Sequence, residues 1–259
     1  MSEGRIDVPL QRLTTEGSEI RKEVIVEEVA IQLQGLDENG AFFTHATLLA
    51  TPTDLIELHA GHLISEGYVE KIPSRGLFTI RDESSIHVDF QGRVYSPIRE
   101  RIVTSSCGAC NHPNLSLGQA KNLPNDSTFS RLEFSKIRSA LNSLTASMEL
   151  FKISGGSHGS GLFCMQGSLT FVSEDIGRHN AVDKTIGKHI LDGNTNFSET
   201  MLLLSGRCGW DIVAKAARVG IPAIASFGAF SSAAVQLARE QNIILYGFVG
   251  NDGAWKVGY

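Results

Sequence analysis

The sequence predicts an α/β protein, in which an α/β core is joined to a smaller, mixed α/β N-terminal part. In the second half of the chain, helical periodicity alternates with short apolar strands, a pattern typical of parallel sheets with crossover helices. In the first third, runs rich in β-branched residues flank one helical segment. The 259 residues, of which 42% are hydrophobic, suffice for one large domain or two smaller ones, with a core that needs no disulfide or metal.

The N-terminal part is expected to begin with a frayed polar leader, because residues 1–17 lack the apolar stretch of a secretory signal. Residues 24–33 and 41–49 are predicted strands of a hairpin, since Asn39-Gly40 between them is a turn signal. A helix should follow, with Thr53-Asp54 as its N-cap and Gly67 just past its end. Further strands are expected at 77–81, 86–90 and 98–103.

A pair of cysteines and a polar connector come next. Cys107 and Cys110 enclose Gly-Ala, and residues 111–130 are dominated by Asn, Pro, Ser and Gly. Loops of this length are usually functional or disordered. We therefore divide the chain into an N-terminal part at 1–104, a mobile connector with the cysteine pair at 105–130, and an α/β core at 131–259.

The core is expected to begin with a helix at 134–151 and a hairpin around Gln166-Gly167. Helices and strands then alternate, in the order 179–191, 201–205, 211–219, 223–226, 231–240 and 243–248. Such a series implies parallel strands, and functional sites in open sheets of this kind gather at the carboxyl ends of the strands.

Composition narrows the function. The net charge of −5 argues against a protein that binds nucleic-acid backbones, which would carry a broad basic face. No apolar run approaches the ~18–20 residues that span a bilayer, so no membrane partner is expected. These features favour a cytoplasmic protein with reduced thiols, in which a close cysteine pair is more often catalytic or metal-binding than structural.

The pair Cys107 and Cys110 is the first candidate site. A thiolate is the nucleophile in sulfur chemistry. Two thiols this close could accept a sulfur atom as a persulfide, form a disulfide, or supply half of a zinc site. The motif alone does not choose among these three chemistries.

Neither zinc nor thioredoxin-like chemistry gains support from the rest of the sequence. Cys164 and Cys208 lie far apart in or beside predicted strands, where small buried residues are common, so they are poor zinc partners. A zinc deaminase needs His-x-Glu, and none of the eight histidines has Glu two residues on. A thioredoxin-like pair should open a helix, whereas this pair precedes a polar loop. No metal site is therefore predicted.

Three further segments place polar side chains at predicted strand ends. A glycine-rich loop carries His158, whose neighbouring amides could cradle an anion, although a flexible connection would look the same. Arg178 and His179 open a helix after a strand, and Arg207 does so after the next strand, so the two arginines could flank one cleft.

Acidic residues around Arg178 allow two interpretations. Asp175 or Asp183 could accept from a guanine edge or hold Arg178 in place. A charged helix start, with Asp–Arg pairing and Asn180 as a cap, would explain about half of these residues without any ligand. The tail segment 247–253 is equally consistent with a simple hairpin.

Taken together, the motifs resemble those of the formate dehydrogenase accessory sulfurtransferase family. The resemblance covers nearly the whole chain after residue 20, and its most specific stretch is Gly-Arg-His-Asn-Ala-Val-Asp-Lys. The matching motifs begin at Ala50, Ser105, Ser154, Glu174, Ser205 and Lys215.

The resemblance implies a cytidine-deaminase-like, three-layer α/β core without the deaminase zinc site. It implies a sulfur carrier that accepts sulfur from a cysteine desulfurase as a persulfide. The sulfur then passes to the molybdenum bis(molybdopterin guanine dinucleotide) cofactor, the bound substrate, which formate dehydrogenase needs for activity. Cys107 matches the persulfide carrier and Cys110 the second thiol. The family's cofactor-contacting segment falls on Phe248, Val249, Gly250, Asn251, Asp252 and Gly253. A homodimer is expected from family likeness alone.

The chain departs from the family pattern near the expected nucleotide contacts, at 208–211, at 227–231 and at Gly250. The sulfur-carrying pair is intact. The leading hypothesis is therefore a persulfide carrier that also holds the cofactor, with Arg178, His179, Arg207 and His158 among the binding residues. The alternatives are a non-catalytic chaperone that only binds the cofactor and an adaptor that binds zinc through the cysteine pair.

Overall fold

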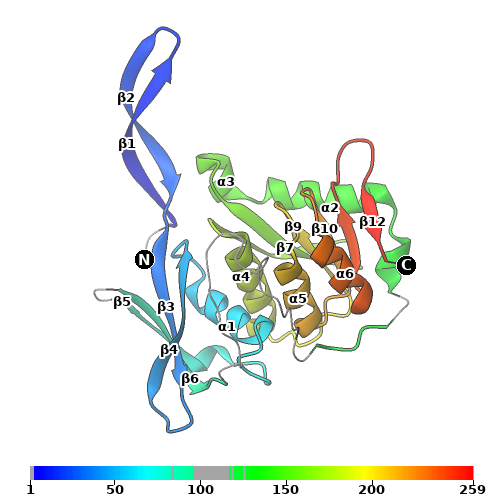
Figure 1. Ribbon diagram of the computed structural model, residues 1–259. Coiled ribbons are helices and arrows are strands. Elements are labelled where there is room, and N and C mark those ends of the chain that lie inside the picture. Colours follow the sequence, from blue (N-terminus) through cyan, green and yellow to red (C-terminus); the bar gives the residue numbers. More distant parts are fainter. Residues whose placement is uncertain (1–2, 83–84, 96–116, 118–119, 125–126, 259) are drawn as a thin grey trace.

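The computed structural model describes residues 3–82, 85–95, 117, 120–124 and 127–258. These residues form three sheets with their covering helices (Figure 1). The strands are β1 (Arg5–Thr14), β2 (Gly17–Val26), β3 (Val29–Leu36), β4 (Phe42–Ala50), β5 (Phe78–Asp82), β6 (Ile86–Arg93), β7 (His158–Cys164), β8 (Leu169–Asp175), β9 (Thr200–Leu204), β10 (Ala223–Ser226), β11 (Ile244–Gly247) and β12 (Trp255–Val257). The helices are α1 (Leu55–Ser65), α2 (Phe134–Ala146), α3 (Glu149–Ser154), α4 (Arg178–Leu191), α5 (Trp210–Val219) and α6 (Ser232–Glu240), with 3₁₀ turns η1 (Arg75–Leu77) and η3 (Thr128–Arg131).

The core is built on a six-stranded sheet in the order β12-β11-β10-β9-β7-β8. Strands β9, β10 and β11 are parallel, while β7, β8 and β12 are antiparallel to their neighbours. The predicted helix–strand alternation and the predicted hairpin around Gln166-Gly167 are therefore confirmed. The carboxyl ends of the three parallel strands lie at one edge of the sheet.

Alternating side chains along the central strands fill two separate apolar layers, because successive residues of a strand point to opposite faces. Leu202, Leu204 and Ile224 face the layer formed with α4, α5 and α6. Met201 and Leu203 face the layer formed with α2. Figure 1 shows α4, α5 and α6 side by side on one face and α2 on the other. The expected three-layer core is thus confirmed.

The N-terminal part contributes a four-stranded sheet, in the order β4-β3-β6-β5, and the helix α1. Helix α1 packs against α4 of the core at two glycines. A Cβ atom at Gly61 would lie 1.8 Å from the Asp183 carbonyl oxygen, and one at Gly187 would lie 1.9 Å from the Glu57 carbonyl oxygen. Side chains at either position would force the helices apart, so the two parts share one tightly packed seam.

The first strands differ from the prediction. The expected polar leader forms a hairpin of β1 and β2 instead, which projects from the body of the molecule in Figure 1. Ile6, Val8 and Leu10 stand at every second position, the spacing typical of a strand, within an otherwise polar stretch. Residues 24–26 end β2, so the second hairpin begins only at β3. Its pairing of β3 with β4 is as predicted.

Two helix termini also differ. Asp54 stands at the N-cap of α1 but accepts no capping hydrogen bond, because its φ of 50° is left-handed and its carboxylate pairs with Lys188 at 2.7 Å. The helix expected at 134–151 is broken into α2 and α3. Met148, which is 1% exposed, turns into the core at the break, and its sulfur occupies the space beside Gly159.

The proposed division of the chain remains a prediction. Residues 96–116, with the cysteine pair and the strand expected at 98–103, lie outside the described part. Within the connector, Lys121 N donates to Ala217 O at 3.1 Å, and Phe129 is fully buried. In the described ranges, the helices are all too short or too polar to cross a bilayer.

Replacing Gly187 tests the helix seam. We expect Gly187→Ala to lower the free energy of unfolding by about 2–3 kcal/mol, since the new Cβ would meet backbone and overpacking typically costs ~1–3 kcal/mol. Urea denaturation followed by circular dichroism measures the change. Gly76→Ala is the control, because nothing lies within 4 Å of its Cβ position. Equal stability of the two variants would contradict the close approach of α1 and α4.

Candidate functional site

Three loops meet at the carboxyl edge of the parallel strands. Residues 205–209 follow β9, residues 227–231 follow β10, and residues 248–253 follow β11. Hydrogen bonds join them: Phe248 N donates to Gly228 O at 3.0 Å, and Cys208 N donates to Ala229 O at 2.9 Å. A Cβ at Gly228 would lie 2.7 Å from Gly206 O, so the loops are stacked with little space between them.

His158 joins this edge from the first residue of β7. The next residue donates its amide to the Ser205 side chain, with 2.8 Å between Gly159 N and Ser205 Oγ. A Cβ at Gly206 would lie 3.0 Å from His158 Nδ1. The ring of His158 thus lies against the loop that carries Arg207.

The predicted cations gather around His158. Burial lowers the pKa of this histidine, and the positive charges of Arg178, Arg207 and His179 lower it further. The charges of these three basic side chains therefore act on the His158 ring. We call His158, Arg178, His179 and Arg207 the cationic edge. The structure therefore brings together these four predicted site residues, with His158 favoured in its neutral form.

The cationic edge has groups that are available to an anion. Arg207 is exposed, whereas the Nε atom of the half-buried Arg178 is shielded from solvent and has no hydrogen-bond partner among the described residues. Arg178 also opens α4, whose first amides point toward the same edge. The exposed Arg207 guanidinium, together with the first amides of α4, fits a phosphate or another anionic ligand.

Asp211 is a site residue that the sequence analysis did not single out. Its carboxylate pairs with His179. Burial raises the pKa of Asp211, but the hydrogen bond and charge of His179, together with Arg178, outweigh burial and lower it. Gly209 leaves room for this carboxylate, since a Cβ there would lie 2.4 Å from Asp211 Oδ1. The departure from the family pattern at 208–211 therefore supplies a partner for His179.

The tail segment presents an aromatic ring beside the cationic edge. Phe248 is 48% exposed and has a left-handed φ of 53°, a conformation that is uncommon for a bulky residue. Its ring makes an edge-to-face contact with Phe230, at 5.4 Å between centroids. Such strain often accompanies function.

The six tail residues are not equivalent. Val249 is 3% exposed and packs in the core, so its side chain cannot contact a ligand. Asn251 and Asp252 are exposed, and Gly250 N donates to Gly253 O at 2.9 Å to close the turn. The segment thus offers Phe248 and a short polar turn to a ligand.

The acidic members of the family motif have a structural role instead. Asp175 pairs with Lys184 at 2.7 Å, and both side chains are fully buried. Lys184 also donates to Thr51 O at 2.9 Å. Asn180 lies inside α4 and donates to Leu49 O at 2.8 Å, so it is not a cap. The interpretation that Asp175 contacts guanine or holds Arg178 is wrong, because its oxygens are used to join β4 to the core.

Asp183 of α4 likewise links the core to the N-terminal part, through α1. Its carboxylate accepts from Lys215 at 2.7 Å and from Ser65 at 2.6 Å, and it lies 3.0 Å from His62 Nδ1. Burial raises the pKa of Asp183, but Lys215 and His62 lower it by more, so its pKa lies below the usual value. The same ion pair, aided by Glu66, raises the pKa of Lys215 against the effect of burial. Asp183 cannot reach guanine from this position.

Of the four cysteines, the structure describes two. Cys208 is 3% exposed, a small buried residue as predicted, and burial raises the pKa of its thiol. Cys164 is only half-buried, with its sulfur 3.7 Å from Thr170 Oγ1, so it is less enclosed than expected. Cys107 and Cys110 lie outside the described residues. Among the described residues, no cluster of His, Cys, Asp and Glu could hold a metal ion.

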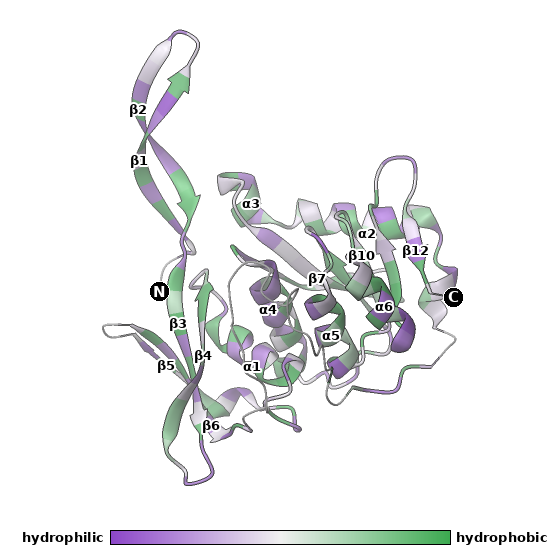
Figure 2. Cartoon of the chain, in the orientation of Figure 1, coloured by the Kyte–Doolittle hydropathy of each residue, from purple (hydrophilic) through white to green (hydrophobic). Residues whose placement is uncertain are grey.

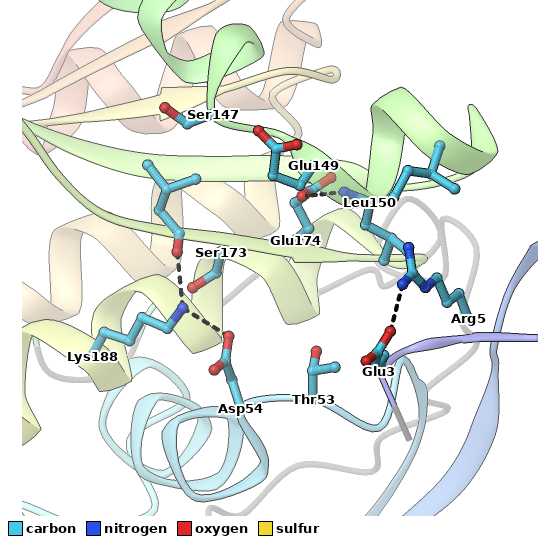
Figure 3. A pocket seen from close by; sticks show the side chains of 12 residues that line it. Glu3, Arg5, Thr53, Asp54, Ser147, Glu149, Leu150, Ser173, Glu174 and Lys188 are labelled. Carbon is cyan, nitrogen blue, oxygen red and sulfur yellow. Dashed lines mark hydrogen bonds and ion pairs between the residues drawn. The ribbon is translucent and has the colours of Figure 1, made fainter. Parts of the chain in front are cut away.

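A cavity of about 330 Å³ lies between the base of the N-terminal hairpin and the core, away from the cationic edge (Figure 3). Its charged groups are largely paired with one another: Lys188 with Asp54 at 2.7 Å, and Arg5 with Glu3 at 2.5 Å. Glu174 accepts the amides of α3 instead. None of the predicted site residues lines this cavity.

Comparison with known proteins agrees with the resemblance that the sequence motifs carry. The model of the FdhD/NarQ family matches residues 26–255. The sulfur carrier protein FdhD of Sulfurisphaera tokodaii is 33% identical over 242 residues, which cover 93% of this chain and 92% of that protein. The protein of the same name from Saccharolobus solfataricus is 37% identical over 204 residues, which cover 79% and 77%.

A solved structure shows the same fold. The crystal structure of a candidate formate dehydrogenase accessory protein from Desulfotalea psychrophila aligns with a TM-score of 0.73 and 23% identity, covering 98% of this chain and 97% of that one. The three-layer core and the N-terminal part therefore belong to one shared architecture.

The pKa of His158 tests the cationic edge. We expect Arg207→Ala to raise this pKa toward the ordinary value of 6.5, since one neighbouring positive charge is removed. An NMR titration of the histidine ring resonances measures it. Arg239→Ala, on the exposed face of α6, is the control and should leave the titration unchanged. An unchanged His158 in Arg207→Ala would mean that the two side chains are not neighbours.

The two roles within the family motif can be separated by substitution. Asp183→Asn should lower the free energy of unfolding by roughly 3–5 kcal/mol, because it removes the more buried of the two carboxylates that pair with buried Lys215. Arg178→Ala, only five positions away, should change stability by less than about 1 kcal/mol because it sits at the surface edge. Chemical denaturation of both variants measures this contrast. A stable Asp183→Asn protein would contradict the structural role.

Proposed function

The chain belongs to the FdhD/NarQ family, and from that premise we propose that it is a sulfurtransferase that carries a persulfide on Cys107 and delivers its sulfur to a molybdenum cofactor bound at the cationic edge. The cofactor is the bis(molybdopterin guanine dinucleotide) form, and the enzyme served is a formate dehydrogenase. The observation that carries the proposal is the cationic edge itself, where exposed Arg207 lies in the loop that packs on His158 and Arg178 opens α4.

The first step loads the carrier. The Cys107 thiolate attacks the outer sulfur of a cysteine persulfide on the desulfurase. The S–S bond of that persulfide breaks, the desulfurase cysteine leaves as a thiolate, and its outer sulfur remains on Cys107 as a new persulfide. No oxidant is consumed, because one S–S bond replaces another.

The second step releases the sulfur. The Cys110 thiolate attacks the inner sulfur of the Cys107 persulfide, which forms a Cys107–Cys110 disulfide and expels hydrosulfide toward the bound molybdenum cofactor. A dithiol reductant then returns the pair to thiols. The spacing of the two residues, with Gly-Ala between them, suits this exchange.

The cationic edge suits the guanine nucleotide ends of this substrate. Arg178, Arg207 and the first amides of α4 would hold phosphate oxygens. The exposed ring of Phe248 would stack on a planar base or pterin ring. Neutral His158 can donate or accept a hydrogen bond there without adding charge.

The chain length also permits the transfer. Arg218, near the C-terminal end of α5, donates to Leu117 O at 3.1 Å, whereas Arg207 precedes the N-terminal end of that helix. The ten residues of α5 extend about 15 Å. About ten residues separate Cys107 from Leu117, and an extended chain of that length can reach about 33 Å. A segment of that length would suffice to bring Cys107 to the cationic edge, as the proposal requires.

The persulfide is tested directly by mass. The purified protein is incubated with a cysteine desulfurase and cysteine, and intact and peptide masses are taken. We expect one added sulfur on the peptide that contains Cys107, removable by a thiol reductant and absent from Cys107→Ser. Arg178→Ala is the matched control, since it should load sulfur normally and fail only in delivery to the dehydrogenase.

Two results would reject the proposal. A folded, reduced protein that gains no sulfur would favour the chaperone that only binds cofactor, in which both thiols are dispensable. Stoichiometric zinc that disappears when Cys107 and Cys110 are replaced would favour the adaptor.

A further inference from the structure

The turn between β11 and β12 has little packing of its own. Gly250 and Gly253 have no side chains, and nothing lies within 4 Å of a Cβ placed at Gly253. Asn251 and Asp252 are exposed. Within the turn, the bond from Gly250 N to Gly253 O is the local closure. A turn of this composition would sample many conformations unless another element holds it.

Helix α2, which lies on the face of the core sheet opposite α4, α5 and α6, holds this turn. Arg138 Nη1 donates to the backbone oxygen of Asn251 at 3.0 Å, and Arg138 Nη2 donates to its side-chain Oδ1 at 2.8 Å. The two residues are 113 positions apart in the sequence. A planar guanidinium that makes two bonds to one residue fixes both its position and its orientation.

Two other contacts near α2 hold strands β11 and β12 rather than the turn between them. Tyr246 of β11 donates to Phe129 O at 2.7 Å, and Lys256 of β12 donates to Ser130 O at 2.9 Å. Together they fix the hairpin against η3. Arg138 extends this support to the turn itself.

We propose that Arg138 is a positioning residue, which holds the 248–253 segment in the conformation that receives the guanine nucleotide end of the substrate. This inference rests on the proposed function. Asn251 accepts both bonds as a neutral residue, and no carboxylate among the described residues pairs with Arg138. No carboxylate of the described residues therefore neutralises this positive charge beside the turn, and the charge can attract an anionic ligand.

The two hydrogen bonds from Arg138 to Asn251, which we call the Arg138 clamp, act through preorganisation. A ligand that must first order its own binding segment has its affinity reduced by the fraction of molecules in the competent conformation. If removal of the clamp leaves the turn competent in roughly a tenth to a third of molecules, the Kd rises by about 3- to 10-fold.

Guanosine diphosphate is the probe for the nucleotide end, measured by isothermal titration calorimetry on the full chain. We expect Arg138→Ala to raise its Kd by about 3- to 10-fold. Arg138→Lys keeps the charge but cannot make both bonds, so it should also bind at least about 3-fold more weakly. Lys136→Ala is the matched control, because Lys136 is exposed on the same helix. It should bind like the wild type.

Hydrogen exchange supplies a readout that does not depend on ligand. The amide of Gly250 should exchange faster in Arg138→Ala than in Lys136→Ala, with unchanged exchange in β9 and β10. Wild-type affinity in Arg138→Ala, or full rescue by Arg138→Lys, would overturn the clamp. If the wild type binds no guanosine diphosphate, the proposed nucleotide site is rejected. The clamp is then tested by hydrogen exchange alone, and an unchanged Gly250 exchange rate in Arg138→Ala would reject it too.

Discussion

The buried ion pair between Asp183 of α4 and Lys215 of α5, together with the α1 side chains that bond to it, joins the N-terminal part of the chain to its core, and the position of the cationic edge depends on it. Two charges removed from water are tolerable only when each satisfies the other and further hydrogen bonds complete them. Ser65 and His62 of α1 provide those bonds. The pair therefore ties α1, α4 and α5 together, and the N-termini of α4 and α5 carry the site.

This arrangement explains why the most specific family motif mixes two kinds of residue. Along α4, Asp183 and Lys184 point into the seam with α1 and β4, whereas Arg178 and His179 emerge at the sheet edge. The glycine contacts between α1 and α4 bring the helices close enough for the buried pairs to form. The distribution of green and purple along α4 in Figure 2 reflects this mixed character, since polar residues occur on a largely buried helix.

Much of the core was predictable, because hydrophobic periodicity and glycine stops are local signals. The strand–helix alternation from β9 onward and the gathering of Arg178 and Arg207 at one edge followed from them. The partners of the buried charged residues could not be predicted from these local signals. Asp183 meets His62 and Lys215 only after folding, and Asp211 meets His179 across two helices. The hairpin of β1 and β2 was missed because its strands are exposed, so their polarity resembled that of a leader.

The tail segment shows how such non-local contacts change the meaning of a motif. Sequence resemblance treats residues 248–253 as one ligand-contacting unit, yet Val249 is committed to the core and Asn251 to Arg138. What remains for a ligand is the ring of Phe248, the charge of Arg138 and the exposed polar turn at 251–252. Gly250 has no side chain, yet a guanidinium from α2 lies beside the same turn. A cation can therefore serve this segment from a helix that no local motif would connect with it.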